Sequence, residues 1–216
     1  MHQVTASASL KDPSIRQIIP SPDPTSATAT KRPSLTTQAA GSDTEFFSRL
    51  TAAPAIDLPR VTFIGDSIMQ GATPMIEDVF GEDNYNDAAR KRKMEEVPAL
   101  VKTLSREGHL SHVVVIHLGS NRPVEVPVFD NGMEALLDLG VERAIFINVH
   151  RPIGWEYYLN RNFMEGVARW QQAEMIDWDA LAHSEQGWFI RDQTHLSYAG
   201  SEAYVNAIQE KLGTDP

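Results

Sequence analysis

The sequence predicts an α/β protein of three layers, in which helices cover both faces of a mostly parallel, five-stranded sheet. Two observations carry this prediction. From about residue 43 onward, short apolar runs rich in β-branched residues alternate with longer amphipathic segments. The connections between these segments are short, which favours parallel strands joined by right-handed helical crossovers.

Five segments have the composition of strands. The first, Val61–Ile64, contains only β-branched and aromatic residues and ends at a glycine that lets the chain turn sharply. Val113–His117 and Ala144–Asn148 are apolar throughout most of their length, as expected of strands buried on both faces. A short strand is expected near Tyr85, and the last one at Met175–Trp178.

Helices are expected between and after these strands. The segments with helical periodicity are Pro74–Phe80, Met94–Arg106, Gly132–Leu139, Trp155–Trp170 and Ala199–Leu212. Pro98 lies in the second segment and is expected to break or kink that helix. In such a sheet the residues that follow the strands meet at one edge, where open α/β sheets bind their ligands.

The N-terminal region differs in composition from the rest. Residues 1–40 contain 23 Ser, Thr, Ala or Pro and no aromatic residue, too little apolar surface to offset the entropy of ordering. We expect residues 1–42 to form a disordered linker and residues 43–216 to form the folded domain. An ordinary frayed terminus is the alternative.

Composition excludes several classes of protein. The chain has no cysteine, so neither a disulfide framework nor a thiolate metal site is available. The net charge of −10 argues against nucleic acid as a partner, whereas a neutral glycan or glycolipid remains compatible. No apolar run approaches the roughly 20 residues that span a bilayer, so secretion would require a segment upstream.

A candidate nucleophile and its base stand at opposite ends of the expected domain. Ser67 follows the first strand in the sequence Gly65-Asp66-Ser67, and a serine needs a base to take its proton. Near the end of the chain, Asp192 precedes His195 by three residues on an expected loop. Asp192 can then fix the tautomer of His195, whose other ring nitrogen takes the Ser67 proton.

Other residues compete for these roles. Ser67 could merely cap the helix that is expected to begin near Thr73. Asp66 is adjacent to the nucleophile and more plausibly ties down the turn through backbone N–H groups, so Asp192 is preferred as the acid. His117 lies within a strand and is expected to be a satisfied core or sheet-edge histidine, while His150 follows a strand and could line the cleft.

A third motif follows the strand Val113–His117. The sequence Gly119-Ser120-Asn121 forms a small-residue turn, and the Asn121 amide can donate to a developing oxyanion. In this order, Gly-Asp-Ser, Gly-x-Asn and Asp-x-x-His resemble the motifs of the SGNH (GDSL-like) hydrolase superfamily, over roughly residues 58–212. Within it, the chain is most similar to the extracellular C-terminal domain of peptidoglycan O-acetyltransferases.

The narrower resemblance depends on further segments. They are Gly65–Met69, Leu118–Asn121, Asn148–Trp155 with Asn160, Met175–Trp178, and Asp192–Leu196. The resemblance implies a flavodoxin-like three-layer fold, a Ser67–His195–Asp192 triad, no metal and no cofactor. It also implies a bacterial domain at the extracellular face of the cell membrane, preceded along the chain by a membrane-spanning acyltransferase domain.

The resemblance also implies an oxyanion hole and a substrate cleft. The donors would be the backbone N–H of Ser67, the Asn121 amide, and the backbone N–H of Lys91, which occupies the position of a family glycine. A backbone donor survives this replacement if Lys91 adopts the required backbone angles. Arg122 stands where relatives often have a small residue and would narrow the cleft or contact an anionic group. Trp155 is the candidate for a cleft wall, with a core position as the alternative.

The predicted function is transfer of an acetyl group from a donor to a hydroxyl of a cell-wall glycan through an acyl-Ser67 intermediate. The first alternative is a free-standing SGNH esterase that acts on acetylated carbohydrate or lipid, with water in place of the sugar hydroxyl. The second is a non-catalytic glycan-binding domain, which the presence of all three triad residues disfavours.

Overall fold

The computed structural model describes residues 58–213 of the chain. The expected linker at residues 1–42, together with residues 43–57 of the expected domain, lies outside the described residues. Among residues 58–213, no helix has both the length and the apolar character needed to cross a membrane.

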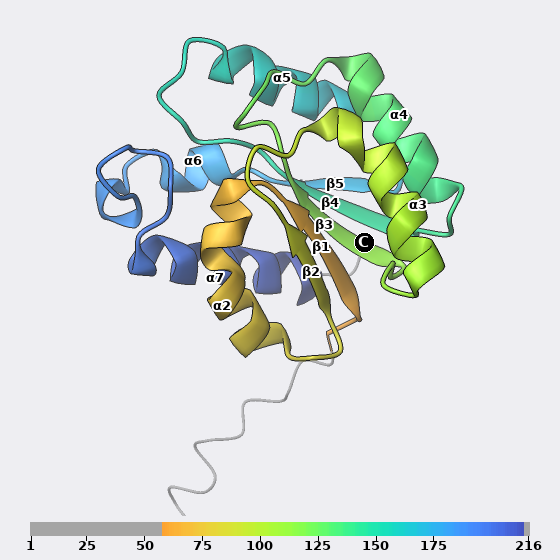
Figure 1. Ribbon diagram of the computed structural model, residues 1–216. Helices are drawn as coiled ribbons and strands as arrows, with labels where there is room; N and C mark the ends of the chain where they lie inside the picture. Colours follow the sequence, from red (N-terminus) through yellow and green to blue (C-terminus); the bar gives the residue numbers. More distant parts are fainter. Residues whose placement is uncertain (1–57, 214–216) are drawn as a thin grey trace, which may run out of the picture. The chain divides into compact units, whose positions relative to one another are not determined.

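A parallel sheet of five strands forms the centre of the domain (Figure 1). Its strands are β1 (Val61–Gly65), β2 (Tyr85–Ala88), β3 (Val113–His117), β4 (Arg143–Ile147) and β5 (Ala173–Ile176). They lie in the order β2-β1-β3-β4-β5, and every neighbouring pair is parallel. The expected three-layer α/β fold is confirmed, and the described sheet is parallel throughout.

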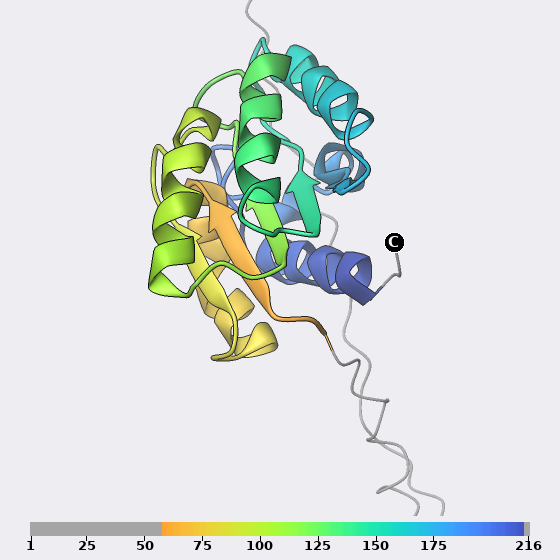
Figure 2. The ribbon, with the colours of Figure 1, turned by 90° about the vertical axis from the view of Figure 1, so that its right-hand side faces the viewer.

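Helices cover both faces of this sheet (Figures 1 and 2). They are α2 (Ser67–Phe80), α3 (Val97–Glu107), α4 (Val126–Leu137), α5 (Glu156–Val167), α6 (Trp178–Ala182) and α7 (Tyr198–Gly213). Short 3-10 turns precede α3 at Met94–Glu96 and α7 at Gln186–Trp188. Helices α3, α4 and α5 pack on one face of the sheet, and α2 and α7 pack on the other.

Each face of the sheet has its own hydrophobic core. Phe129, Phe146 and Phe163 pack together beneath α4 and α5, with ring centroids 4.4 to 6.1 Å apart. On the other face, the buried Trp178 and Tyr204 rings meet edge to face. The strands are therefore buried from both sides, which explains their continuous apolar sequence.

Several features of the helices and strands differ from the sequence predictions, and three of these differences have a local cause. Helix α2 begins at Ser67 rather than at Pro74, because the Asp66 side chain accepts the Ile68 N–H and caps the helix there. Pro98 neither breaks nor kinks a helix, because it lies in the first turn of α3, where its missing N–H has no intrahelical partner to lose. The last expected strand ends early, since Asp177 caps a short helix at Trp178.

Candidate active site

The turn after β1 places Ser67 at the carboxyl edge of the sheet. A Cβ atom on Gly65 would lie 2.4 Å from the Met69 Cβ, so only glycine lets the new helix fold back this tightly. Asp66 caps the helix, and half-buried Ser67 is its first residue. The hydroxyl thus sits at the positive end of α2, where an adjacent negative charge is stabilised.

The predicted base reaches this serine from the other end of the domain. His195 lies in the segment before α7, with its Nε2 atom 3.0 Å from the Ser67 Oγ. Its Nδ1 atom lies 2.6 Å from Asp192 Oδ2. A proton on Nδ1 would leave Nε2 free to accept the Ser67 proton. The structure therefore brings the three predicted residues into the order that a triad requires.

Asp192 is held in place by the backbone of its own loop. Its Oδ1 atom accepts the Thr194 N–H at 3.0 Å and the His195 N–H at 2.9 Å. Partial burial alone would raise the pKa of Asp192, but these hydrogen bonds and the His195 ring outweigh it and hold the pKa below its usual value. The carboxylate is ionised at neutral pH and orients His195.

Asp66 has a role beyond the turn that the sequence predicted. Its carboxylate is fully buried and accepts the Ser120 Oγ at 2.5 Å and the Asn121 Nδ2 at 3.3 Å. Asn121 also contacts the backbone oxygen of Arg92 at 3.4 Å. These contacts hold the Asn121 amide beside the β1 turn, where the sequence placed an oxyanion donor.

Lys91 adopts a backbone conformation that glycine favours. Its φ angle is +64°, in the left-handed region that side chains rarely occupy. The loop that contains Lys91 is fixed against β1 by the Ala89 N–H, which donates to the Gly65 oxygen at 3.0 Å. This conformation suits a position that a glycine occupies in the family, and a backbone donor at Lys91 stays a prediction.

The two expected substrate-binding residues lie in different surroundings. Arg122 projects from the loop after β3, and its Nη1 atom pairs with Glu95 Oε1 at 3.2 Å. Trp155 directly precedes α5, and its half-buried ring packs against the core under α4 and α5. A place for Trp155 in the cleft wall stays a prediction.

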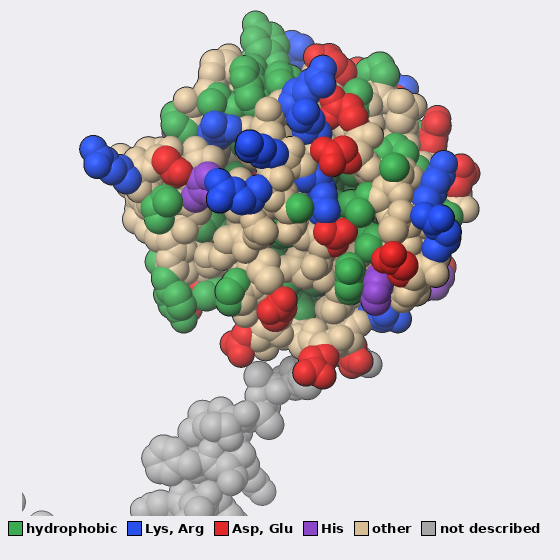
Figure 3. All heavy atoms as spheres, in the orientation of Figure 1, with side chains coloured by type: hydrophobic (Ala, Val, Ile, Leu, Met, Phe, Trp, Pro, Cys, Tyr) green, Lys and Arg blue, Asp and Glu red, His purple; other side chains and the backbone are tan. Residues whose placement is uncertain are grey.

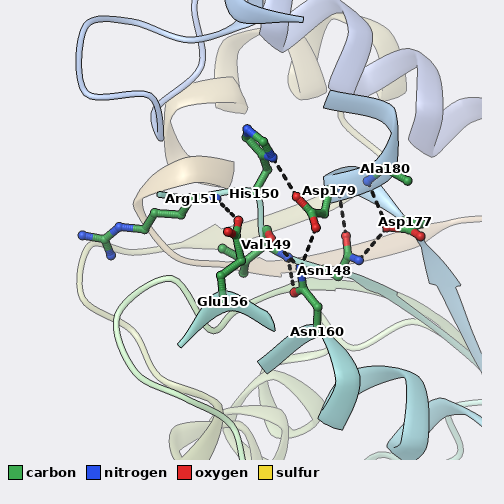
Figure 4. Close-up of polar contacts among 9 residues, drawn as sticks. All are labelled: Asn148, Val149, His150, Arg151, Glu156, Asn160, Asp177, Asp179 and Ala180. Atoms are coloured by element: carbon green, nitrogen blue, oxygen red, sulfur yellow. Dashed lines mark hydrogen bonds and ion pairs between the residues drawn. The ribbon is translucent and has the colours of Figure 1, made fainter. Parts of the chain in front are cut away.

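A second polar cluster lies at the same edge of the sheet, after β4 and β5 (Figure 4). The His150 Nδ1 atom lies 2.7 Å from Asp179 Oδ1, and Glu156 accepts the Arg151 backbone N–H. Ligand atoms of His150, Glu156 and Asp179 lie within 4.8 Å of one another, close enough to hold a metal ion. Burial raises the pKa of Glu156, with a smaller contribution from the nearby Asp179.

Two asparagines support this second cluster. Asn160 accepts the Val149 N–H and donates to the Val149 oxygen, at 3.1 and 2.8 Å, and also approaches Asp179 Oδ2 at 3.3 Å. Asn148 accepts the Asp179 N–H at 2.9 Å and donates to Asp177 at 2.7 Å. Because every member has a partner within the protein, the cluster is explained as a brace for the loop between β4 and α5.

Sequence reasoning missed several residues that shape the site. The Arg151 guanidinium donates to the Ser120 backbone oxygen and so joins the loops after β3 and β4. Arg92 pairs with Asp87 at 2.7 Å beneath the Lys91 turn. In the sequence, Ser120 was recognised only as a small residue beside Asn121. A single sequence gives no signal for hydrogen bonds between distant loops, so the structural roles of Ser120, Arg92 and Arg151 could not be inferred from it.

A surface pocket adjoins the triad. It lies between α2 and the residues leading into α7, and its volume is about 450 Å³. Gly71 and Pro74 line one side, and Leu196 and Tyr198 line the other. Since Leu196 follows His195 directly, a ligand in this pocket would lie close to His195.

The fold and the order of these groups define a class of protein. The domain has the SGNH-hydrolase fold, with Ser67, Asn121 and the Asp192–His195 pair at the carboxyl edge of its parallel sheet. Its homologues are peptidoglycan O-acetyltransferases, as the sequence motifs predicted. No protein-family model matches the chain.

Two of these homologues show the extent of the sequence similarity. Peptidoglycan O-acetyltransferase OatA of Listeria monocytogenes is 23% identical over 159 residues, which are 73% of this chain and 25% of that protein. O-acetyltransferase OatA of Staphylococcus aureus is 25% identical over 155 residues, which are 70% of this chain and 24% of that protein. The chain thus spans about a quarter of the length of these relatives.

Solved structures share the fold. The C-terminal catalytic domain of peptidoglycan O-acetyltransferase A from Streptococcus pneumoniae, with a methylsulfonyl adduct, matches 72% of this chain and 93% of its own, with a TM-score of 0.59 and 15% identity. A carbohydrate esterase of family 3 from Talaromyces cellulolyticus matches 72% of this chain and 96% of its own, with a TM-score of 0.57 and 13% identity.

Proposed function

We propose that this chain is the catalytic domain of an enzyme that transfers acetyl groups to hydroxyls of a cell-wall glycan. The observation that carries the proposal is the unbroken chain of hydrogen-bonding distances from Asp192 through His195 to Ser67. The homologues, which are named as peptidoglycan O-acetyltransferases, support the choice of reaction and of acceptor class.

The chemistry has two steps. Ser67 Oγ attacks the carbonyl carbon of an acetyl donor while His195 Nε2 takes the serine proton. The donor oxygen then leaves with that proton, and an acetyl-serine remains. In the second step a glycan hydroxyl attacks the acetyl-serine, His195 takes its proton and returns it to Ser67 Oγ as the bond breaks.

The oxyanion that forms in each step must be stabilised by hydrogen-bond donors. The Asn121 amide and the backbone N–H groups of Ser67 and Lys91 are the candidates. Substrate binding must draw the Asn121 amide away from its contacts to Asp66 and Arg92, which at 3.3 and 3.4 Å are long for hydrogen bonds. No metal or cofactor is required by this mechanism.

The remaining parts of the proposal concern the whole protein. The relatives are about four times longer than the matched region, which supports a larger protein in which a membrane acyltransferase domain precedes this one. Acetyl transfer would then take place at the extracellular face of a bacterial membrane, where a cell-wall glycan is accessible.

One substitution tests the nucleophile. Ser67→Ala is expected to abolish release of p-nitrophenol from p-nitrophenyl acetate, because no acyl-enzyme can form. The exposed Ser184→Ala serves as the matched control and should retain wild-type turnover. Wild-type turnover by Ser67→Ala would refute the triad.

A second experiment separates transfer from hydrolysis. The structural match to a carbohydrate esterase favours a free-standing esterase as the second candidate, since only the attacking oxygen differs. Mass spectrometry of a chito-oligosaccharide incubated with enzyme and p-nitrophenyl acetate distinguishes them. A gain of acetyl that Ser67→Ala abolishes supports the transferase, whereas free acetate alone supports the esterase.

A further inference from the structure

The Arg151 side chain leaves the second polar cluster and reaches the turn that carries Asn121. The Arg151 backbone N–H donates to Glu156 within the cluster. Its guanidinium donates instead to the Ser120 carbonyl oxygen, which belongs to a residue 31 positions away along the chain. In Figure 4 the Arg151 side chain extends away from the other members of the cluster. Arg151 is therefore fixed at its backbone by its own loop and at its guanidinium by the loop after β3.

Ser120 is held at both its side chain and its backbone. It is only 2% exposed, and its Oγ atom donates to Asp66 Oδ2 at 2.5 Å, while its carbonyl oxygen accepts the Arg151 guanidinium. The preceding residue, Gly119, has a φ angle of +121°, a backbone conformation that residues with a side chain rarely adopt. These constraints determine where the chain leaves the turn and enters Asn121.

The Asn121 amide has weaker contacts of its own. It belongs to an exposed residue, and its nitrogen lies 3.3 Å from the Asp66 carboxylate and 3.4 Å from the Arg92 carbonyl oxygen. Both distances are long for hydrogen bonds, and in the proposed mechanism the amide leaves both partners to donate to an oxyanion. The constraint that then remains is the backbone of the turn, one residue earlier. Because Arg151 holds that backbone, it can influence the reaction through Asn121.

A merely solvated arginine is the first alternative. Lys and Arg side chains are spread over the upper part of the face shown in Figure 3, so a positive charge by itself does not single out one residue. Arg151 is half-buried, however, and within residues 58–213 no carboxylate lies at ion-pair distance from its guanidinium. Its hydrogen bond to Ser120 is charge-assisted, and such bonds are stronger than neutral ones. The guanidinium therefore has a defined place in the fold.

We propose that Arg151 is a positioning residue for the oxyanion donor Asn121 and acts through the Ser120 carbonyl group. This inference rests on the proposed function, and it adds a residue from the loop after β4 to the residues that control the reaction. Arg151 itself does not contact the substrate. A donor displaced by about 1 Å can cost up to about 10²-fold in rate, so loss of the guanidinium should lower kcat and leave KM nearly unchanged.

The experiment replaces Arg151 and follows hydrolysis of p-nitrophenyl acetate. Arg151→Met keeps an unbranched side chain without a donor, and we expect it to lower kcat about tenfold with KM within about twofold of wild type. Arg151→Lys keeps a charged donor and should recover part of the loss, to about threefold below wild type. Arg161→Met is the matched control, because it removes the same charge from the exposed face of α5, where the guanidinium lies over the Tyr158 ring. The control should keep the wild-type kcat.

A double variant separates positioning from general support of the fold. In protein that already carries Asn121→Ala, Arg151→Met should lower kcat less than about twofold, because the donor that it positions is absent. A residue that only stabilises the domain would cause the same loss with and without Asn121. Circular dichroism confirms that each variant is folded. If Arg151→Met does not fold, Arg151→Lys in the two backgrounds provides the same comparison.

The outcomes separate the inference from the function on which it rests. A wild-type kcat for Arg151→Met, or an undiminished loss beside Asn121→Ala, would overturn the role of Arg151 and leave the transferase proposal intact. A raised KM with unchanged kcat would also overturn it, since it would indicate contact with the substrate. Wild-type turnover by Ser67→Ala would remove the triad itself, and the inference with it.

Discussion

Within residues 58–213, two aspartate–histidine pairs lie at one edge of the sheet, and they differ in what the second ring nitrogen can reach. Asp192–His195 and Asp179–His150 have nearly equal Nδ1–Oδ distances, 2.6 and 2.7 Å. His195 presents its Nε2 atom to Ser67. The His150 ring instead stacks on Phe189, with centroids 4.8 Å apart.

This difference shows that an aspartate–histidine pair does not define an active site by itself. The carboxylate fixes the ring in both pairs, but of these two histidines only His195 has its second ring nitrogen at hydrogen-bonding distance from a serine hydroxyl. The supports differ too, because Asp192 is held by the N–H groups of its own loop, whereas Asp179 is held by Asn148 and Asn160. The first pair is expected to control rate and the second to control stability.

The test with the largest expected effect replaces each of the two histidines with alanine. His195→Ala is expected to lower kcat for p-nitrophenyl acetate on the order of 10⁵-fold, because Ser67 loses its base. His150→Ala should change kcat less than about threefold. Stopped assays of both purified variants, with circular dichroism to confirm folding, measure the contrast. Comparable losses of kcat would erase the distinction between the pairs.

The acids provide the next test. Asp192→Asn is expected to reduce kcat by up to about 10⁴-fold, since the amide favours the wrong tautomer of His195. Asp179→Asn should retain turnover but lower the free energy of unfolding by about 1–2 kcal/mol through its lost charge-assisted hydrogen bonds. Urea denaturation and steady-state kinetics separate the two effects. A stable, inactive Asp179→Asn would assign that cluster to catalysis.

The asparagines extend the comparison to smaller effects. Asn121→Ala should reduce kcat about 10²–10³-fold with little change in stability, because it removes one oxyanion donor. Asn160→Ala should leave kcat nearly intact and lower the free energy of unfolding by about 1–3 kcal/mol, because the backbone of Val149 loses both partners. An active Asn121→Ala enzyme would remove this residue from the oxyanion hole.

His117 provides a further test, because this histidine has no hydrogen bond to a carboxylate among the described residues. Its ring is fully buried, Tyr204 OH lies 2.8 Å from Nδ1, and Nε2 has no hydrogen-bond partner among the described residues. Burial lowers the pKa of His117, so its stabilising contribution is present above the unfolded value of 6.5 and is lost as the pH falls toward the folded value.

The corresponding measurement is stability against pH. Between about pH 7 and pH 5, the free energy of unfolding of the wild type should fall more steeply than that of His117→Gln, by at most about 1.4 kcal/mol per pH unit. The exposed His112→Gln is the control and should follow the wild type. Parallel curves for wild type and His117→Gln would contradict the assigned shift.

The sequence predicted those features that depend on local pattern. The strands β1 and β3 were located to within one residue, because buried β-branched runs and the glycines after them are visible in a single chain. The Asp192–His195 spacing and the Gly65–Ser67 turn likewise carry their own signal. The structure places these groups together as predicted, while their catalytic role stays a proposal.

What the sequence did not predict depends on contacts between distant loops. The start of α2 at Ser67 was missed because Pro74 suggested a later start, whereas the Asp66 cap decides it. The ion pair of Arg122 with Glu95 and the contact of Arg151 with Ser120 require the folded positions of separate loops. The sequence did not predict the second aspartate–histidine pair, His150 and Asp179, for the same reason. These residues follow β4 and β5 respectively, and they come together only when the two strands lie side by side.

The separation of Ser67 and His195 by 128 residues has a consequence for biosynthesis. The ribosome synthesises the proposed nucleophile, Ser67, soon after the first strand, but the proposed base, His195, emerges only with the segment that precedes the final helix. If Ser67 and His195 act as proposed, a partly translated domain cannot hydrolyse esters, however much of its sheet has formed. Esterase activity during synthesis would accordingly report docking of α7 against α2, and a chain truncated before residue 195 would be hydrolytically inert.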